Sequence, residues 1–218
     1  RYIRRQRQMC IRDRIKDRFH KDFILGIGTG STANCFIEII KKENPEIKAF
    51  VSSSQASSAI LESAGYEISE LNDVGGPDLY VDGADEVNSK FELIKGGGGA
   101  HSREKIVAAA SKEFICIVDD SKIVKKLGSF PLAIEVIPMA RSYVARQIVA
   151  MGGKPTYRIG FVTDNGNQII DVVNLNFDVP YETEIRLNRI PGVVDNGIFA
   201  SRKADKVISA NSKEARAL

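Results

Sequence analysis

The sequence predicts an α/β protein with an open, mostly parallel sheet and a smaller α+β domain inserted into it. Two observations carry this prediction. Between residues 22 and 119, short apolar runs alternate with helical segments of about ten residues, as parallel strands joined by right-handed crossovers do. From residue 130 the order changes to strand, helix, two strands, helix and strand, which is the βαββαβ order of a ferredoxin-like domain.

The elements of the parallel sheet follow from local patterns. Short apolar runs predict buried strands, and segments at helical period predict helices, one of them closed by Gly65, a residue that favours helix C-termini. Strands are expected at 22–27, 47–52, 78–81, 114–119 and, returning after the insertion, 204–210; helices are expected at 33–42, 55–64 and 102–110.

The inserted domain is expected at residues 130–198, so that 19–129 and 199–218 form the catalytic α/β domain. Asn165-Gly166 is a hairpin signal between two of its strands. Its strands are expected at 132–137, 156–161, 168–173 and 192–198, and its helices at 140–151 and 181–188.

Length and composition exclude several classes of protein. The 218 residues are enough to bury a core without cross-links. No apolar run approaches the roughly 18 residues of a membrane span, and the arginine-rich start lacks the apolar core of a secretory signal. The three scattered cysteines contain no C-x-x-C, which argues against a disulfide framework or structural zinc and favours a reducing cytoplasm.

The net charge of +3 belongs to the N-terminal tail. Residues 1–18 hold eight basic and two acidic side chains, so the remainder of the chain is mildly acidic. A basic arm can bind nucleic acid. A solvated or foreign extension is the simpler interpretation, because the segment resembles a translated sequencing adapter. We therefore expect a non-native tail, no nucleic-acid partner and no membrane partner.

A glycine-rich turn between the first strand and the first helix suits a phosphate. Residues 26–32 read GIGTGST, which offers backbone N–H groups, a helix N-terminus and the hydroxyls of Ser31 and Thr32. The third glycine comes one residue too early for G-x-G-x-x-G and no G-K-[ST] follows, which disfavours a dinucleotide or nucleoside triphosphate. A tight turn with Ser31 or Thr32 as helix N-cap is the structural alternative.

Two carboxylates follow the strand DLYV. Asp82 and Asp85 lie at the carboxyl end of this strand, where open α/β sheets bind ligands. Two neighbouring carboxylates are suited to proton transfer. Turn formation, helix capping and a divalent cation are the alternatives, and the absence of a nearby His argues against zinc.

Four consecutive glycines, residues 96–99, cost chain entropy, so the backbone there must approach something closely or move. Lys95 precedes them and could neutralise an oxyanion. Glu104 lies in the first turn of the next helix, either for chemistry or as a capping partner, and His101 is interpreted as incidental. Together with the two sites above, this set fits proton transfer beside the carbonyl of a small phosphorylated substrate.

Six segments together resemble the type A ribose-5-phosphate isomerases. They are, in family order, GIGTGSTA, DLYVDGADEVN, LIKGGGGAHSREKIVA, VDDSKIVKKLG, FPLAIEVIPMARSYV and RIPGVVDNGIFA. The resemblance implies interconversion of D-ribose 5-phosphate and D-ribulose 5-phosphate in the non-oxidative pentose phosphate pathway. It also implies a NagB/RpiA/CoA-transferase-like, Rossmann-like fold with a ferredoxin-like lid domain, no metal or coenzyme, and a homodimer or homotetramer.

The same resemblance implies roles for individual residues. Glu104 would be the general base, with Asp82, Asp85 and Lys95 as the other catalytic side chains. The substrate-binding positions would be Thr29, Gly30, Ser31, Thr32, Gly83, Ala84, Gly96, Gly97, Gly98 and Lys122, with Ser31, Thr32 and Lys122 on the phosphate. Two departures stand out. Residues 1–18 do not match the family's first helix, which brings a lysine to the phosphate, and His101 replaces a usually apolar residue.

Two other functions compete with the isomerase. A non-catalytic sugar-phosphate-sensing domain of the same fold would need a helix-turn-helix, for which the roughly 21 residues before the first strand leave no room. An acyl-CoA transferase would use a carboxylate nucleophile and usually a longer or two-subunit chain. The joint presence of Asp82, Asp85, Lys95 and Glu104 favours the isomerase.

Overall fold

The computed structural model describes residues 16–210 and 215–217, which form two compact units. The first unit contains the described residues of Arg1–Gly83, Ile106–Ser121 and Ala204–Leu218. The second contains Ala84–Lys105 and Lys122–Lys203. It is larger than the insertion predicted at 130–198, so the predicted domain boundaries stay a proposal; most of the tail 1–18 lies outside the described residues.

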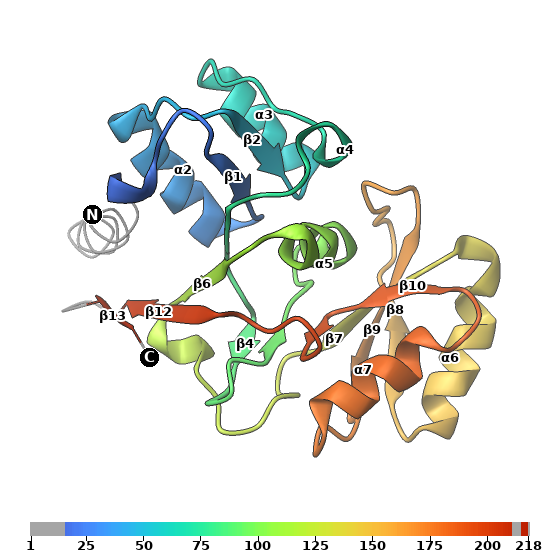
Figure 1. Cartoon of the computed structure of the whole chain (residues 1–218). Helices are drawn as coiled ribbons and strands as arrows, with labels where there is room; N and C mark the ends of the chain where they lie inside the picture. Colours follow the sequence, from blue (N-terminus) through green and yellow to red (C-terminus); the bar gives the residue numbers. More distant parts are fainter. Residues whose placement is uncertain (1–15, 211–214, 218) are drawn as a thin grey trace. The chain divides into compact units, whose positions relative to one another are not determined.

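The first unit is built on a six-stranded sheet with the order β13-β12-β6-β3-β1-β2 (Figure 1). All neighbouring pairs are parallel except β12 and β13, which confirms the predicted open, mostly parallel sheet. The strands are β1 (Ile24–Ile27), β2 (Ala49–Ser52), β3 (Leu79–Asp82), β6 (Phe114–Val118), β12 (Lys206–Ala210) and β13 (Ala215–Ala217).

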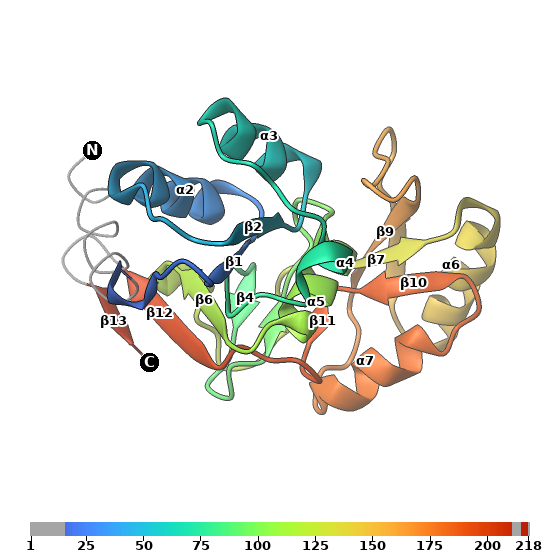
Figure 2. The same cartoon turned by 45° about the horizontal axis from the view of Figure 1, so that its top comes forward.

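Helices cover the sheet of the first unit because its strands are apolar on both faces. Leu25 and Ile27 of β1 share a core with Phe36 of α2, whereas Gly26 between them faces Val107. Figure 2 shows α2 and α3 side by side along the sheet. The helical elements of this unit are η1 (Lys16–Arg18), α2 (Ser31–Glu43), α3 (Gln55–Ser63), α4 (Leu71–Val74), η2 (Asp120–Lys122, ending in the second unit) and the end of α5 (His101–Ala110).

The second unit contains a four-stranded antiparallel sheet with the order β10-β7-β9-β8. The chain order β7-α6-β8-β9-α7-β10 confirms the predicted ferredoxin-like pattern. Its elements are β7 (Leu132–Val136), η3 (Pro138–Ala140), α6 (Arg141–Ala150), β8 (Lys154–Tyr157), β9 (Gln168–Val173), α7 (Pro180–Asn188) and β10 (Val193–Asn196).

The two faces of this antiparallel sheet differ. Leu132, Ile134 and Val136 of β7 pack in one core with residues of α6 and α7. Strand alternation places Ala133 and Glu135 on the opposite face, and Asp171 is paired with Ala133 across the β7–β9 ladder. This second face is polar and nevertheless buried at β7, where Ala133 and Glu135 are both fully covered.

The structure corrects two expected strands and adds four short ones, β13 in the first unit and three that form a separate sheet. The strand expected at 192–198 is broken at Gly197, because its N–H donates to the carbonyl of Ala133 in β7 while its carbonyl accepts from the Lys95 N–H, each at 2.8 Å. Only glycine fits there, since a Cβ would lie 2.1 Å from the carbonyl oxygen of Lys95. β10 therefore ends at Asn196, and β11 (Ile198–Phe199) joins β5 (Leu93–Ile94) and β4 (Glu86–Val87) in a separate three-stranded sheet. The strand expected at 156–161 begins and ends earlier, as β8.

Candidate active site

The turn after β1 is held in place by Asp82. The Thr29 N–H donates to Asp82 Oδ1 at 3.0 Å, and the Gly28 N–H donates to the carbonyl of Val81 at 2.9 Å. A Cβ on Gly28 would lie 1.9 Å from Asp82 Cγ, so the turn requires glycine at this position. The sequence signal GIGTGST thus marks a close approach between the ends of β1 and β3.

The first turn of α2 differs from the capping alternative. Gly30, with φ 93°, is the N-cap of the helix, and no side chain caps it. Ser31 and Thr32 are the first two helical residues, so the interpretation of either as N-cap is wrong. Ser31 is exposed and Thr32 half-buried, and Gly83 approaches Thr32 closely, since a Cβ there would lie 3.3 Å from Thr32 Cβ. Backbone N–H groups, hydroxyls and the helix N-terminus together suit an anion.

Asp82 is fully buried at the end of β3 and accepts several hydrogen bonds. Besides the Thr29 N–H, its Oδ1 accepts from the Gly83 N–H at 2.7 Å, and its Oδ2 accepts from the Tyr80 hydroxyl at 2.5 Å. Such bonds are required when a carboxylate is buried. Tyr80 was missed in the sequence, although its position two residues before Asp82 places both on the same face of β3.

The second unit pairs Lys95 with Glu104. Lys95 Nζ lies 3.2 Å from Glu104 Oε2, and the two residues are only 3% and 5% exposed. Lys95 follows β5, and Glu104 lies in the first turn of α5, as the sequence predicts. The Phe199 ring, which the sequence did not single out, lies 5.7 Å from Lys95 Nζ. Because desolvating both charges costs more than a surface pair would, this buried pair is a strong candidate for chemistry.

The glycine run is closely packed at Gly96, Gly97 and Gly99 and open at Gly98. Gly96 and Gly99 have φ of 107° and 79°, and added Cβ atoms would lie 2.7 Å from Ala133 Cβ and 2.3 Å from Phe161 Cζ. Gly97 and Gly98 are exposed. The expected close approach is therefore made by the backbone against Ala133 of β7 and the Phe161 ring.

Three further predicted site residues lie in the second unit, together with His101, which the sequence analysis interprets as incidental. Asp85, half-buried like its neighbour Ala84, accepts from the Gly97 N–H at 2.8 Å. Lys122 lies at the end of η2 with its Nζ 5.7 Å from the Phe130 ring. His101 is fully buried, and burial, aided by the charge of Lys105, lowers its pKa to about 4. It is therefore neutral at pH 7 and suited to a structural role.

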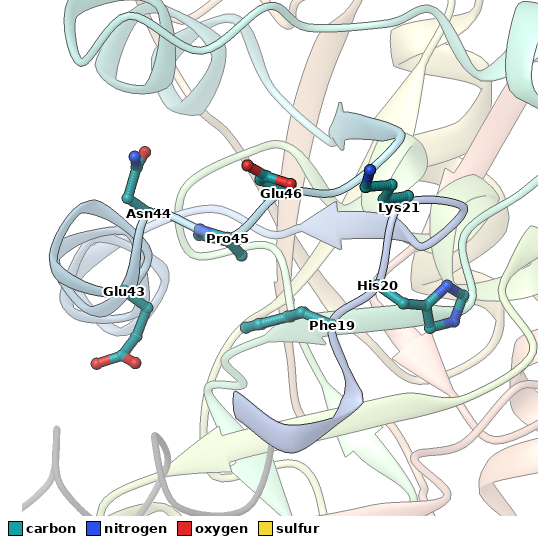
Figure 3. A pocket seen from close by; sticks show the side chains of 7 residues that line it. All are labelled: Phe19, His20, Lys21, Glu43, Asn44, Pro45 and Glu46. Atoms are coloured by element: carbon teal, nitrogen blue, oxygen red, sulfur yellow. The ribbon is translucent and has the colours of Figure 1, made fainter.

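Figure 3 shows a pocket of about 370 Å³ in the first unit. It is formed by the segment before β1 and the loop after α2, whereas Thr29 to Thr32 lie at the opposite ends of these two elements. It contains none of the predicted site residues. Its lining is Phe19, His20, Lys21, Glu43, Asn44, Pro45 and Glu46.

The described part of the chain holds neither a metal-binding cluster nor a membrane-spanning helix. Within residues 16–210 and 215–217, no cluster of three or more His, Cys, Asp or Glu is arranged to hold a metal ion. In the same residues, no helix combines the length and apolar character needed to cross a membrane. Of the described cysteines, Cys35 is half-buried and Cys116 is buried.

Comparisons with known proteins identify the family. The family model for ribose 5-phosphate isomerase A (phosphoriboisomerase A) matches residues 49–214. The chain is 59% identical over 191 residues to ribose-5-phosphate isomerase A of Legionella pneumophila (strain Corby), covering 88% of each chain. It is 53% identical over 192 residues to that of Dichelobacter nodosus, again covering 88% of each.

Two solved structures share the fold over nearly the whole chain. Ribose 5 phosphate isomerase A from Neisseria gonorrhoeae matches with a TM-score of 0.92 and 45% identity, covering 100% of this chain and 95% of its own. A D-ribose-5-phosphate isomerase in complex with phospho-erythronic acid matches with a TM-score of 0.91 and 34% identity, covering 99% and 97%. The predicted fold class is thereby confirmed, and the chain belongs to the ribose 5-phosphate isomerase A family, as an enzyme with that activity in the pentose phosphate pathway.

Proposed function

We propose that the chain interconverts D-ribose 5-phosphate and D-ribulose 5-phosphate through a cis-enediolate, with Glu104 as the general base. The observation that carries this proposal is the buried Lys95–Glu104 pair beside the glycine run, with Nζ and Oε2 3.2 Å apart. A carboxylate can move a proton between two adjacent carbons, and the neighbouring ammonium can compensate the negative charge that develops on oxygen.

In the proposed reaction, Glu104 takes the proton from C2 of the open aldose, and the C1 carbonyl oxygen becomes negative in the enediolate. The same carboxyl group returns the proton to C1, while the proton of the C2 hydroxyl passes to the C1 oxygen. Lys95 and backbone N–H groups of the glycine run stabilise the anion; one preorganised donor of this kind is worth about 3–4 kcal/mol.

Asp82 and Asp85 have two candidate roles. As catalytic groups they would exchange protons with the ring and chain oxygens while the sugar opens. The three hydrogen bonds that Asp82 accepts favour instead a positioning role for this residue, which leaves Asp85 for proton exchange. Asp82→Asn keeps an oxygen for the two N–H groups, so a positioning role predicts kcat within a few-fold of wild type. Proton exchange by Asp82 predicts a loss of about two orders of magnitude.

The phosphate is proposed to bind at the N-terminus of α2. Thr29, Gly30, Ser31 and Thr32 offer N–H groups and hydroxyls there, and Gly83 and Ala84 border the sugar. The relative solved with phospho-erythronic acid supports a sugar phosphate as ligand. Lys122 would add a cation, which anchors a phosphate with charge-assisted hydrogen bonds. Holding the non-reacting end orients the carbons for proton transfer.

Several expectations remain part of the proposal. They are catalysis without metal or coenzyme, assembly as a homodimer or homotetramer, a cytoplasmic location, and no nucleic-acid or membrane partner. The alternative function, a non-catalytic sugar-phosphate-sensing domain, would bind ribose 5-phosphate without turning it over.

Glu104→Gln tests the proposal. The change is nearly isosteric, so a base role predicts that kcat falls by roughly two orders of magnitude or more with KM little changed. Deuterium incorporation at C2 from heavy water should fall in parallel. Glu113→Gln is a matched control, because Glu113 pairs with Arg18 and Lys206 at the start of β6. A Glu104→Gln variant as active as this control would make Glu104 structural.

A further inference from the structure

Arg158, the residue directly after β8, contacts the glycine run from the ferredoxin-like sheet. Its own N–H donates to the carbonyl of Ile169 at 2.9 Å, which extends the β8–β9 ladder by one residue. Its Nε and Nη2 donate to the two carboxylate oxygens of Asp171 at 2.8 and 2.5 Å. The same guanidinium also donates to the carbonyl of Gly96 at 3.2 Å and to that of Gly97 at 3.3 Å.

These contacts fix the direction of two peptide groups. The described peptide bonds are trans, so the C=O and N–H of each peptide point in opposite directions. The Gly96–Gly97 peptide is held on both sides, by Arg158 at its carbonyl and by Asp85 at its N–H. The Gly97–Gly98 peptide is held by Arg158 at its carbonyl, so the Gly98 N–H is directed away from the guanidinium.

Gly98 borders open space, whereas the next glycine is packed against an aromatic ring. A Cβ on Gly98 would meet nothing within 4 Å, and the residue is exposed. Gly99 abuts Phe161, whose ring centre lies 5.3 Å from the Arg158 guanidinium carbon. The guanidinium therefore lies between a carboxylate, two peptide carbonyls and an aromatic ring, an arrangement that suits the planar fork of arginine and not lysine.

We propose that Arg158 is a positioning residue for the isomerisation: by holding the carbonyls of Gly96 and Gly97, it directs the Gly98 N–H toward the oxygen that becomes negative in the enediolate. This inference rests on the proposed function. Arg158 acts through the backbone, and its contribution is preorganisation of a donor before charge develops. Removing such a donor costs about 10²–10³ in kcat, so loosening it should cost roughly ten- to a hundredfold.

The test compares Arg158→Gln with wild type in the full chain. Besides kcat and KM for ribose 5-phosphate, it measures the inhibition constant of phospho-erythronic acid, whose carboxylate is a planar anion like the enediolate. We expect kcat to fall about ten- to a hundredfold, KM to stay within about threefold, and the inhibitor to weaken by roughly the same factor as kcat. Loss of a merely structural contact would lower the unfolding midpoint and leave kcat per folded molecule unchanged.

The Arg158→Gln experiment includes a matched control, Arg141→Ala, and a conservative variant, Arg158→Lys. Arg141→Ala perturbs the same strands, because Arg141 lies over the Tyr157 ring at 4.2 Å and donates to Gln168, and its kcat should stay near wild type. Arg158→Lys keeps a charge beside Asp171 but cannot also reach both carbonyls. It should fold even if Arg158→Gln does not, with kcat still reduced about fivefold or more.

The outcomes separate the two proposals. If both Arg158 variants keep kcat and inhibitor affinity within about twofold, or if only KM rises, the positioning role of Arg158 is overturned while the isomerase proposal stands. A wild-type chain without turnover, or a fully active Glu104→Gln variant, overturns the proposed function and with it the inference. A paired loss of kcat and inhibitor affinity, absent in Arg141→Ala, supports it.

Discussion

The close approach of Gly28 to Asp82 makes Gly28→Ala a severe change for one methyl group. Non-bonded carbon atoms normally lie about 3.5–4.0 Å apart, whereas the new Cβ would lie 1.9 Å from Asp82 Cγ. The carboxylate or the end of β1 must therefore move by more than about 1.5 Å. That shift breaks the bonds that Asp82 accepts from the N–H groups of Thr29 and Gly83.

The expected loss follows from those two bonds. Hydrogen bonds to a charged group contribute about 1.5–3 kcal/mol each, so the free energy of unfolding should fall by about 3–6 kcal/mol. Small domains are stable by only about 5–15 kcal/mol in total. Urea unfolding measures the change, and the slope with urea checks that the transition stays two-state.

Gly98→Ala is the matched control for stability, since its Cβ would meet nothing within 4 Å and its backbone is outside the left-handed region. It should unfold like wild type. If the free energy of unfolding of Gly28→Ala lies within about 1 kcal/mol of the wild-type value, Asp82 does not hold the turn after β1.

Three further predictions concern the site and its pH dependence. Lys122→Ala should raise KM for ribose 5-phosphate about tenfold or more, with little effect on unphosphorylated ribose; equal losses for both sugars would remove Lys122 from the phosphate anchor. Exhaustive chelation should leave turnover unchanged, and recovery with Mg²⁺ or Zn²⁺ would make Asp82 and Asp85 metal ligands. Burial lowers the pKa of His101 from 6.5 to about 4 in the folded state. As the pH falls, the imidazole is therefore protonated in the unfolded chain before it is protonated in the folded one. The folded state thus loses, between pH 6.5 and 4, stability that is fully present above pH 6.5. His101→Gln should flatten this part of the unfolding profile, and an unchanged slope would contradict it.

The sequence predicts the larger elements because their signals are local. Apolar runs ended by glycine or a helix start mark β1, β3 and β6, and Asn165-Gly166 marks the turn between β8 and β9. The strands β4, β5 and β11 have only two residues each, too few for a periodic pattern. The break at Gly197 depends on Lys95, about a hundred residues earlier, and a local pattern cannot show such a contact.

In the site too, features that depend on neighbouring residues can be predicted from the sequence, whereas contacts between distant residues cannot. Four glycines in a row predict a close approach, and the structure supplies it. The partners come from distant parts of the chain, Ala133 from β7 and Phe161 from the loop after β8, and depend on the pairing of β9 with both strands. Arg158 and Asp171 likewise share one face only in the observed β8–β9 register, where Asp171 is opposite Thr156. Tyr80 could have been recognised, because its spacing to Asp82 is local.

The second face of the ferredoxin-like sheet supports the segment that carries Lys95, the glycine run and Glu104, the proposed catalytic segment. Burial raises the pKa of Glu135, but the neighbouring side-chain donors Ser102, Asn167 and Thr163 outweigh that effect and keep its pKa below the usual value. The carboxylate therefore stays charged and ties β7 to the hairpin at residues 163–167, while His101 at the start of α5 lies 3.4 Å from the carbonyl oxygen of Asp195 in β10. Ala133 supports Gly96 from the same strand. The helix turn that carries Glu104 and the loop that follows Lys95 are thus both seated on this sheet, within one compact unit. Substitutions on its polar face should change turnover, whereas substitutions on its apolar face should act first on stability.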